Sequence, residues 1–259
     1  MMLKSNMNLT KLKVSVIGCG WLGKPLCDAL INAGCRLKTT TSTIEKANSL
    51  AENYNSHFFD VSIHSPDKLL LDSDVIIYTI PPLGIDEVEK FFSNIPDNRK
   101  SIFLSSISVY GKSRGAVNEE SEVYPDSTNG KLLAESENFL RNHFKNVTIL
   151  RLGGLIGVDR HPVTSLQGNK NLTNGRELLH LVHRDDCISA IISLIEKNIW
   201  NETINLINDL RVPKYEYYTS IAKSLDLVPP EYIEVPILSP TRISNEKSKI
   251  LLSLSYKNN

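Results

Sequence analysis

Residues 14–26 read VSVIGCGWLGKPL, a Val/Ile run that leads through three glycines into an amphipathic pattern. Gly18 permits a tight turn, Gly20 allows the backbone to approach a pyrophosphate, and Gly23 allows a helix to pack closely on the preceding strand. The N-terminus of such a helix attracts phosphate, because its backbone amides and its dipole point at the anion. This stretch predicts a dinucleotide-binding unit whose cofactor-binding residues are Gly18, Gly20, Trp21, Leu22 and Gly23.

Short apolar runs alternate with helical patterns beyond this unit, which is typical of a parallel sheet covered by helices on both faces. The expected strands are residues 13–18, 37–41, 57–61, 75–80, 101–106 and 147–152. The expected helices are residues 22–33, 44–52, 85–94, 130–143 and 186–196. The pattern predicts an α/β protein with a Rossmann-like, doubly wound parallel sheet and a small C-terminal substrate lobe.

Three segments are expected along the chain. Residues 1–11 are predicted to be a flexible N-terminus, and residues 12–155 a dinucleotide-binding Rossmann core. Residues 156–259 are predicted to hold the last core elements and the small substrate-binding lobe. The final part, residues 210–259, contains five prolines and is expected to be irregular, with loops that close the cleft beyond the carboxyl ends of the strands.

Composition argues against several classes of partner. The chain has 29 Lys and Arg against 29 Asp and Glu, a formal net charge of +0, so no global field attracts nucleic acid. No apolar run approaches the ~18 residues of a membrane span, and the first residues lack the apolar stretch of a signal peptide. We therefore expect a cytoplasmic protein that binds a small molecule, with no nucleic-acid or membrane partner.

The cysteines and histidines do not predict a metal site. The four cysteines have no CxxC spacing, and three of them lie in the first strand–helix unit, so we expect reduced, structural thiols. His180 and His183 lack a third ligand at metal spacing, and Asp186 is expected to cap the helix that follows.

The kind of dinucleotide is indicated by the segment LKTTTST, residues 37–43, where an NAD-binding protein would carry an acid for the ribose. Thr41, Ser42 and Lys46 would accept a 2′-phosphate, so NADP is favoured, with NAD possible. Alternatively, the threonines are ordinary β-branched strand residues. Asp60 would accept from the adenine amino group or cap the next segment. Further expected cofactor contacts, at the ends of strands, are Ile80, Pro81, Pro82 and Ser105.

Several later motifs resemble those of one family. SSISVYG at residues 105–111, RLGGLIG at residues 151–157 and HLVHRDD at residues 180–186 occur in the order and spacing of the extended short-chain dehydrogenase/reductase superfamily. The resemblance is to its NAD-dependent epimerase/dehydratase group and covers nearly the whole chain. It implies an oxidoreductase or epimerase/dehydratase-like enzyme acting on a small carbonyl, alcohol or nucleotide-linked metabolite, as a monomer or homodimer.

The resemblance also implies a catalytic set of Ser or Thr, Tyr and Lys, and here the chain departs from the family. Ser106 takes the Ser position. In PDSTNGKLLAESE, residues 125–137, an ungapped match puts Asn129 in the Tyr position and Leu133 in the Lys position. A shift of two residues keeps Lys131 but puts Ser127 in the Tyr position. Neither Asn129 nor Ser127 can act as an acid near neutral pH, so the chain looks like an atypical member of the family.

The ungapped match retains more of the family's pattern, whereas the shifted match retains the lysine. The candidate catalytic residues are Ser106, Lys131 and Tyr124, the last as a substitute from the preceding loop. The candidate substrate-binding residues are Ser108, Arg151, Gly153 and His183. Three functions stay open: an NAD(P)-dependent oxidoreductase or epimerase, a lapsed NADP-binding sensor or scaffold, and a lyase or isomerase without hydride transfer.

Overall fold

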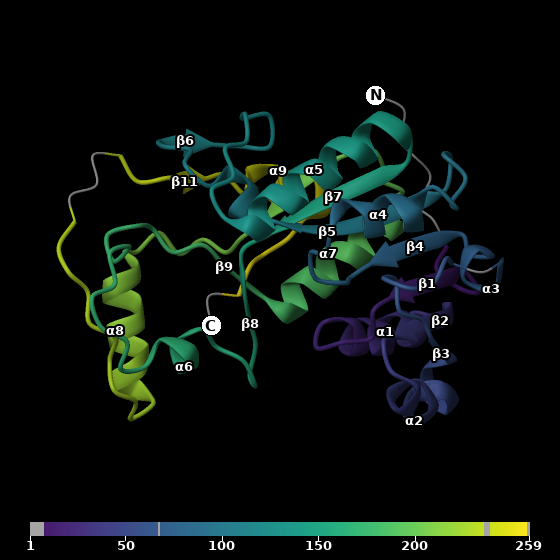
Figure 1. Cartoon of the computed structure of the whole chain (residues 1–259), viewed down its shortest axis with the longest axis horizontal. Coiled ribbons are helices and arrows are strands. Elements are labelled where there is room, and N and C mark those ends of the chain that lie inside the picture. The colour runs from purple at the N-terminus through teal and green to yellow at the C-terminus, as the bar shows by residue number, and fades with distance from the viewer. Residues whose placement is uncertain (1–7, 67, 236–238, 258–259) are drawn as a thin grey trace.

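The computed structural model describes residues 8–66, 68–235 and 239–257, and within them a seven-stranded parallel sheet forms the centre (Figure 1). The strand order is β10-β7-β5-β4-β1-β2-β3. The strands are β1 (Lys13–Ile17), β2 (Arg36–Thr41), β3 (Ser56–Phe58), β4 (Val75–Tyr78), β5 (Lys100–Ser106), β7 (Val147–Leu152) and β10 (Thr203–Leu206). The chain order reverses between β1 and β4, which is where doubly wound proteins bind ligands.

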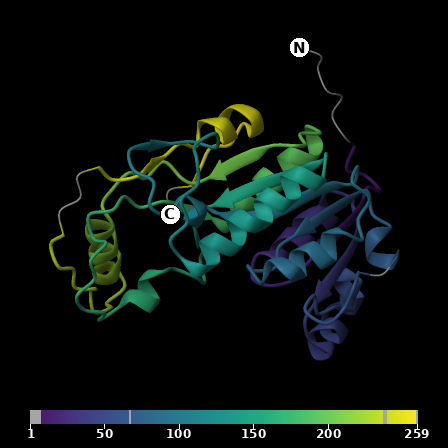
Figure 2. The same cartoon turned by 45° about the horizontal axis from the view of Figure 1, so that its top comes forward.

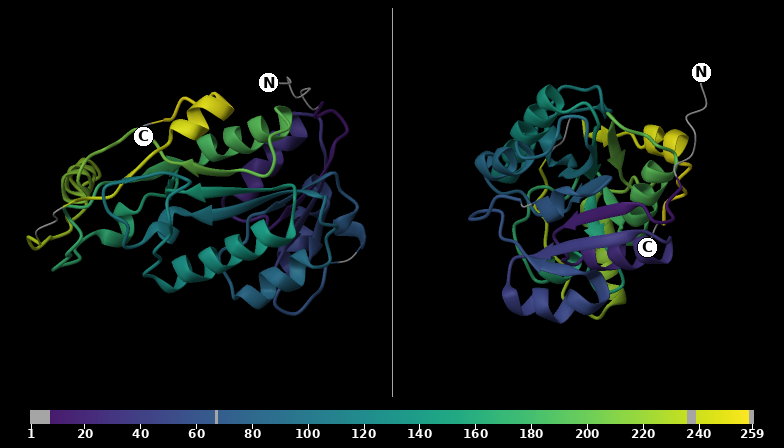
Figure 3. Two further views of the ribbon diagram at one scale, coloured as in Figure 1. Left: turned by 90° about the horizontal axis from the view of Figure 1, so that it is seen from above. Right: turned by 90° about the vertical axis from the view of Figure 1, so that its right-hand side faces the viewer.

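Helices cover both faces of the sheet, which Figure 3 shows edge-on. One face carries α1 (Gly23–Asn32), α2 (Ile44–Tyr54), α7 (Arg184–Glu196) and α9 (Glu246–Leu252). The other carries α3 (Lys68–Leu71), α4 (Ile85–Phe92) and α5 (Thr128–His143). Leu26 and Leu30 of α1 pack with Ile191 of α7 in one core cluster, as their helical spacing requires. The expected fold class is confirmed.

A smaller lobe extends from the carboxyl edge of the sheet, at the left of Figures 1 and 2. Its own core joins Ile156, Leu179 and Tyr218. The lobe contains α6 (Val163–Leu166), α8 (Lys214–Ser224) and the parallel pair β8 (Gly154–Ile156) and β9 (Leu181–His183). A second parallel pair, β6 (Ala116–Val117) with β11 (Arg242–Ile243), lies beside it, next to the short 3-10 turn η1 (Ile107–Tyr110).

The structure differs from the sequence expectations in two elements. The third strand ends at Phe58, because the carboxylate of Asp60 accepts hydrogen bonds from the backbone N–H and hydroxyl of Ser62 and so bends the chain. The expectation of an irregular C-terminal part holds only in part: residues 225–235 and 253–257 carry no helix or strand, but the segment also contains α8 and α9. Leu252 of α9 packs in the core beside α7, so the chain returns from the lobe to the sheet.

Part of the expected flexible N-terminus, residues 1–7, lies outside the described residues. Within the remainder, Leu9 is buried in the core and the Lys11 N–H donates to the Gly34 carbonyl. All four cysteines are free and buried, in agreement with the expectation of reduced, structural thiols. In the described ranges, no helix is both long enough and apolar enough to cross a membrane.

Candidate functional site

The glycine turn between β1 and α1 is held in place from both neighbouring strands. Gly18 has a φ of +107°, a conformation that favours glycine. Its N–H donates to Thr40 Oγ1 at 3.1 Å, and its carbonyl accepts from Thr79 Oγ1 at 2.6 Å. A Cβ on Gly23 would lie 2.1 Å from the Gly18 carbonyl oxygen, so only glycine allows the helix to start this close to the strand.

A cavity of about 380 Å³ opens directly over this turn. Nine of the thirteen expected cofactor residues line it, namely Gly18, Gly20, Trp21, Leu22, Gly23, Ile80, Pro81, Pro82 and Ser105. No side chain in the described part of the chain caps the N-terminus of α1, and no described atom lies within 4 Å of a Cβ built on Gly20. The open backbone at a helix N-terminus fits a pyrophosphate.

The other four expected cofactor residues lie outside that cavity. Thr41, Ser42 and Lys46 lie at the carboxyl end of β2, where the ribose of a dinucleotide would lie. Thr41 donates to the Thr43 carbonyl, while Ser42 and Lys46 are exposed. Asp60 is engaged in its own turn, so of the two roles expected for it the structure shows the cap.

A second cavity of about 300 Å³ lies between the end of β5 and the lobe. Ser106, Ser108 and Tyr110 line it from the sheet side. The lobe contributes charged and polar side chains, which include Glu177, His180 and Lys214. Ser106 lines both this cavity and the one over the glycine turn. Gly153, expected at the substrate, lines the glycine-turn cavity instead.

The lobe side of the second cavity is electrostatically mixed. Lys214 Nζ and Glu177 Oε2 form an ion pair of 2.7 Å. Burial, together with the positive charges of Arg211 and Lys214, lowers the pKa of His180 to about 4. The His180 Nε2 accepts from the Ile243 N–H at 3.4 Å, so the ring is neutral at physiological pH and presents Nδ1 as its donor.

His180 gives a pH-dependent prediction. Its pKa rises from about 4 in the folded protein to the ordinary 6.5 on unfolding. Between these two pH values the His180 ring is protonated in the unfolded chain but neutral in the folded protein. Between pH 8 and pH 5 the protein should therefore lose about 2 kcal/mol more stability than His180→Gln. Urea unfolding of both proteins at the two pH values measures this difference. If the difference in free energy of unfolding between the two proteins is the same at both pH values, the low pKa assigned to His180 is contradicted.

The start of α5 determines which of its residues face the cavities, and so which of the two matches to the family's Tyr and Lys positions fits the structure. Ser127 caps it by accepting from the Gly130 N–H at 3.1 Å, and a Cβ on Gly130 would lie 2.6 Å from the Ser108 carbonyl oxygen. Asn129 and Leu133, four residues apart on one helix face, both line a third cavity of about 540 Å³, which Ser106 also lines, and Leu133 lines the glycine-turn cavity as well. This geometry favours the ungapped match to the family pattern.

Two expected catalytic residues, Lys131 and Tyr124, line neither the glycine-turn cavity nor the second cavity. Lys131 lies between Asn129 and Leu133 in sequence and is therefore on the exposed side of α5. Tyr124 is 52% exposed and donates its hydroxyl to Glu122 Oε2 at 2.5 Å. Ser106 is the one expected catalytic residue that the described structure brings to the two cavities.

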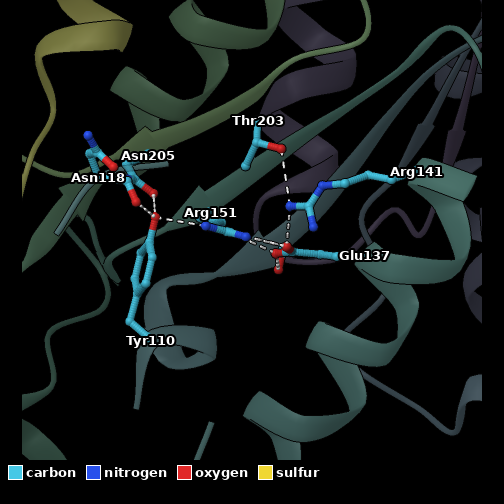
Figure 4. Close-up of polar contacts among 8 residues, drawn as sticks. Tyr110, Asn118, Glu137, Arg141, Arg151, Thr203 and Asn205 are labelled. Atoms are coloured by element: carbon cyan, nitrogen blue, oxygen red, sulfur yellow. Dashed lines mark hydrogen bonds and ion pairs between the residues drawn. The ribbon is translucent and has the colours of Figure 1, made fainter. Parts of the chain in front are cut away.

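Arg151 is the largest correction among the expected substrate residues (Figure 4). Its side chain is buried, with Nη2 2.7 Å from Glu137 Oε2 and Nε 3.1 Å from Glu137 Oε1. Its Nη1 donates to the Tyr110 hydroxyl at 2.8 Å, and Ser105 Oγ donates to the same Glu137 at 2.6 Å. The guanidinium thus joins β7 to α5 and η1, and Arg151 lines neither the glycine-turn cavity nor the second cavity.

Tyr110 is engaged in the same network. Its hydroxyl lies 2.9 Å from both Asn205 Oδ1 and the Asn118 carbonyl (Figure 4). Burial raises the pKa of Tyr110 above its ordinary value. The Tyr110 hydroxyl is therefore held within this network.

His183 is also structural. It is 5% exposed, and its Nδ1 accepts from the Asp185 N–H at 3.2 Å, which makes His183 the N-cap of α7 in place of the expected Asp186. The Asp186 carboxylate instead accepts from the Lys257 N–H. The described residues contain no group of three His, Cys, Asp or Glu side chains placed to hold a metal ion.

Some residues that line the cavities or hold the glycine turn could not be grouped into a site from the sequence. Glu177, His180 and Lys214 are brought together only by the packing of the lobe. Thr79, which fixes the glycine turn, follows β4 without any motif of its own. Asn129 and Leu133 had a signal, because both fall in positions of the family pattern.

Comparison with known proteins adds a sequence relative and a set of similar folds. A family model described as NADP oxidoreductase, coenzyme F420-dependent, matches residues 13–108. Protein YeeZ of Escherichia coli strain K12 is 31% identical over 257 residues, covering 90% of this chain and 93% of that protein.

Two solved structures illustrate the fold. UDP-glucuronic acid 4-epimerase from Bacillus cereus in complex with NAD has a TM-score of 0.75 at 23% identity, covering 96% of this chain and 93% of that one. A functionally unknown conserved protein from Silicibacter pomeroyi has a TM-score of 0.74 at 18% identity, covering 95% and 93%. These likenesses confirm the fold expected from the sequence motifs.

Proposed function

The chain belongs to the family of Escherichia coli YeeZ, and from this premise we propose that it is a member of the extended short-chain dehydrogenase/reductase superfamily and an NADP-binding oxidoreductase or epimerase-like enzyme. Its substrate in this proposal is a small polar carbonyl or alcohol compound. The observation that carries the proposal is the meeting of two cavities at Ser106, one over the glycine turn and one under the lobe. Hydride transfer requires a nicotinamide and a substrate to lie side by side in this way.

The residues of the first cavity suit a dinucleotide. The open amides at the start of α1 would bind the pyrophosphate, and Pro81 and Pro82 would border the path of the cofactor across the sheet. When bound, the nicotinamide would supply the hydride chemistry. The chain's own part is to hold the cofactor and to exclude water with the lobe.

Ser106 would orient the substrate oxygen. Its Oγ accepts from the Ser108 N–H at 3.1 Å, which fixes the hydroxyl and leaves its proton for a ligand. Asn129 occupies the place where the family carries its tyrosine, so a proton would have to come from solvent or substrate. Leu133 occupies the lysine's place and offers only apolar contact.

The preference for NADP rests on the carboxyl end of β2. Residues 37–43 contain no acid, and Lys46 is exposed in the first turn of α2. A lysine near this point would attract a 2′-phosphate, whereas a carboxylate would repel it. NADP is therefore proposed as the cofactor.

Lys46→Glu tests this preference. An exposed ion pair contributes up to about 1 kcal/mol and charge reversal roughly doubles the loss, so NADPH should bind more weakly by up to about thirtyfold. NADH lacks the 2′-phosphate and should bind as to the wild type. Titration calorimetry with both cofactors measures the two effects, and Lys145→Glu, at an exposed pair with Asp97, is the matched control. Equal losses for NADPH and NADH would refute the assignment of Lys46 to the 2′-phosphate.

Turnover tests the enzymatic part of the proposal. The purified protein is incubated with NADPH and a panel of aldehydes, ketones and 2-oxo acids, and the absorbance of the reduced nicotinamide is followed. We expect oxidation with at least one small polar compound, reduced in Ser106→Ala. NADPH binding without any turnover across the panel would overturn the oxidoreductase proposal.

That second outcome would favour another function, an NADP-binding sensor or scaffold. The specific observation behind it is that Asn129 and Leu133 face the cavities while Lys131 and Tyr124 point to solvent. The balanced charge of the chain supports a small-molecule partner in either case, and we propose a cytoplasmic monomer or homodimer.

A further inference from the structure

The turn at residues 157–160 packs against Trp21 of the glycine turn. The Gly157 N–H donates to the Arg160 carbonyl at 2.9 Å and the Arg160 N–H donates back at 3.1 Å, which closes a tight loop after β8. A Cβ on Gly157 would lie 2.9 Å from the indole of Trp21, so glycine is what lets the turn reach the ring. The start of the lobe and the cofactor turn are thereby in direct contact.

Trp21 is the centre of this contact. Its Nε1 lies 3.1 Å from each carboxylate oxygen of Asp159. The guanidinium of Arg160 lies 5.0 Å from the centre of the ring, and that of Arg184 lies 4.6 Å from it. Stacking on an indole restrains a guanidinium while leaving its N–H edges available.

The two arginines differ in their partners. Arg184 forms an ion pair of 3.2 Å with Asp159, which neutralises that carboxylate. Within the described part of the chain, the Arg160 side chain has no hydrogen-bond or ion-pair partner. The cluster therefore has one guanidinium in excess over its carboxylate, and this guanidinium is exposed at the mouth of the glycine-turn cavity, which it lines.

We infer that Arg160 binds the pyrophosphate of the dinucleotide, opposite the N-terminus of α1, and that Trp21 holds the guanidinium in place for it. This assignment rests on the proposed function. A guanidinium offers paired donors that match two phosphate oxygens, so the anion would be bound by backbone amides on one side and by Arg160 on the other. The pyrophosphate is chosen over the 2′-phosphate because Arg160 lines the cavity with Gly18 and Gly20, whereas Ser42 and Lys46 lie outside it.

The test is calorimetric titration of the full-length wild type and Arg160→Gln with NADPH and with NADH. Because both cofactors carry the pyrophosphate, Arg160→Gln should weaken the binding of each cofactor by about tenfold. Arg160→Lys keeps the charge but not the paired donors, so its affinity for both cofactors should lie between those of the wild type and Arg160→Gln. Arg36→Gln, at the exposed amino end of β2, is the matched control and should bind as the wild type.

Coupling to Trp21 is tested by a double-mutant cycle. Trp21→Leu removes the platform, so it should weaken binding in the wild type but have a smaller effect when Arg160 is already Gln. Thermal unfolding of each variant verifies that it is folded. Equal effects of Trp21→Leu in both backgrounds would show that the ring does not hold the guanidinium.

The other outcomes separate the two proposals. Wild-type affinity for both cofactors in Arg160→Gln would overturn the assignment of Arg160 and leave the proposed function intact. A loss confined to NADPH would overturn the pyrophosphate assignment in favour of the 2′-phosphate. No binding of either cofactor by the wild type would overturn the proposed function, and the assignment with it.

Discussion

Replacing Arg151 by methionine is expected to lower the free energy of unfolding by about 3–5 kcal/mol. The substitution leaves the Glu137 carboxylate, 1% exposed, without its main cation and leaves the Tyr110 hydroxyl without a donor. Arg141 remains near Glu137 but is 40% exposed and compensates only in part. Urea unfolding followed by circular dichroism measures the loss.

Two controls define this result. Lys145→Met removes an exposed ion pair whose side chains are 80% and 61% exposed, and should cost no more than about 1 kcal/mol. The double variant Glu137→Leu/Arg151→Met lacks both buried charges. It should therefore be less destabilised than the single variant Arg151→Met. If Arg151→Met unfolds like Lys145→Met, the buried network does not stabilise the site as described.

Gly20→Asp is expected to abolish NADPH binding in practice. A carboxylate about 4 Å from a phosphate in a partly buried site costs about 4 kcal/mol, which corresponds to about a thousandfold in affinity. The variant should fold normally, because no described atom lies within 4 Å of the new Cβ and the φ of Gly20 is not in the left-handed region. Calorimetric titration measures the affinity, and thermal unfolding verifies the fold.

Gly20→Ala is the matched control for Gly20→Asp. It adds the same Cβ without charge, so its loss should be clearly smaller than that of the aspartate. If the aspartate variant still binds NADPH within a few-fold of wild type, the pyrophosphate does not lie at the glycine turn.

The sheet could be predicted from sequence because its signals are local. The glycines of the first turn and the Val/Ile runs around them are contiguous, and β7 has the bounds expected for it. The last fifty residues offered fewer such signals. Their prolines suggested irregular chain, whereas α9 forms on the sheet because Leu252 can pack against the core beside α7. Tertiary packing therefore decided the elements that local sequence could not.

The site was predicted less well than the fold, and Arg151 shows the reason. Its position near the end of a strand suggested a ligand contact, but every residue of VTILRL is buried. An arginine inside a fully buried strand needs a buried partner, and Glu137 is that partner. Helical periodicity likewise separates Lys131 from the cavity face that Asn129 and Leu133 share. The contacts of Arg160 with Trp21 join residues far apart in sequence, so only the structure reveals them.

The cavity over the glycine turn is proposed to bind a nicotinamide dinucleotide. Calorimetric titration of the wild-type protein with NADPH tests this proposal. We expect saturable binding at one site per chain, tighter than that of NADH. The absence of measurable binding of either cofactor would contradict it.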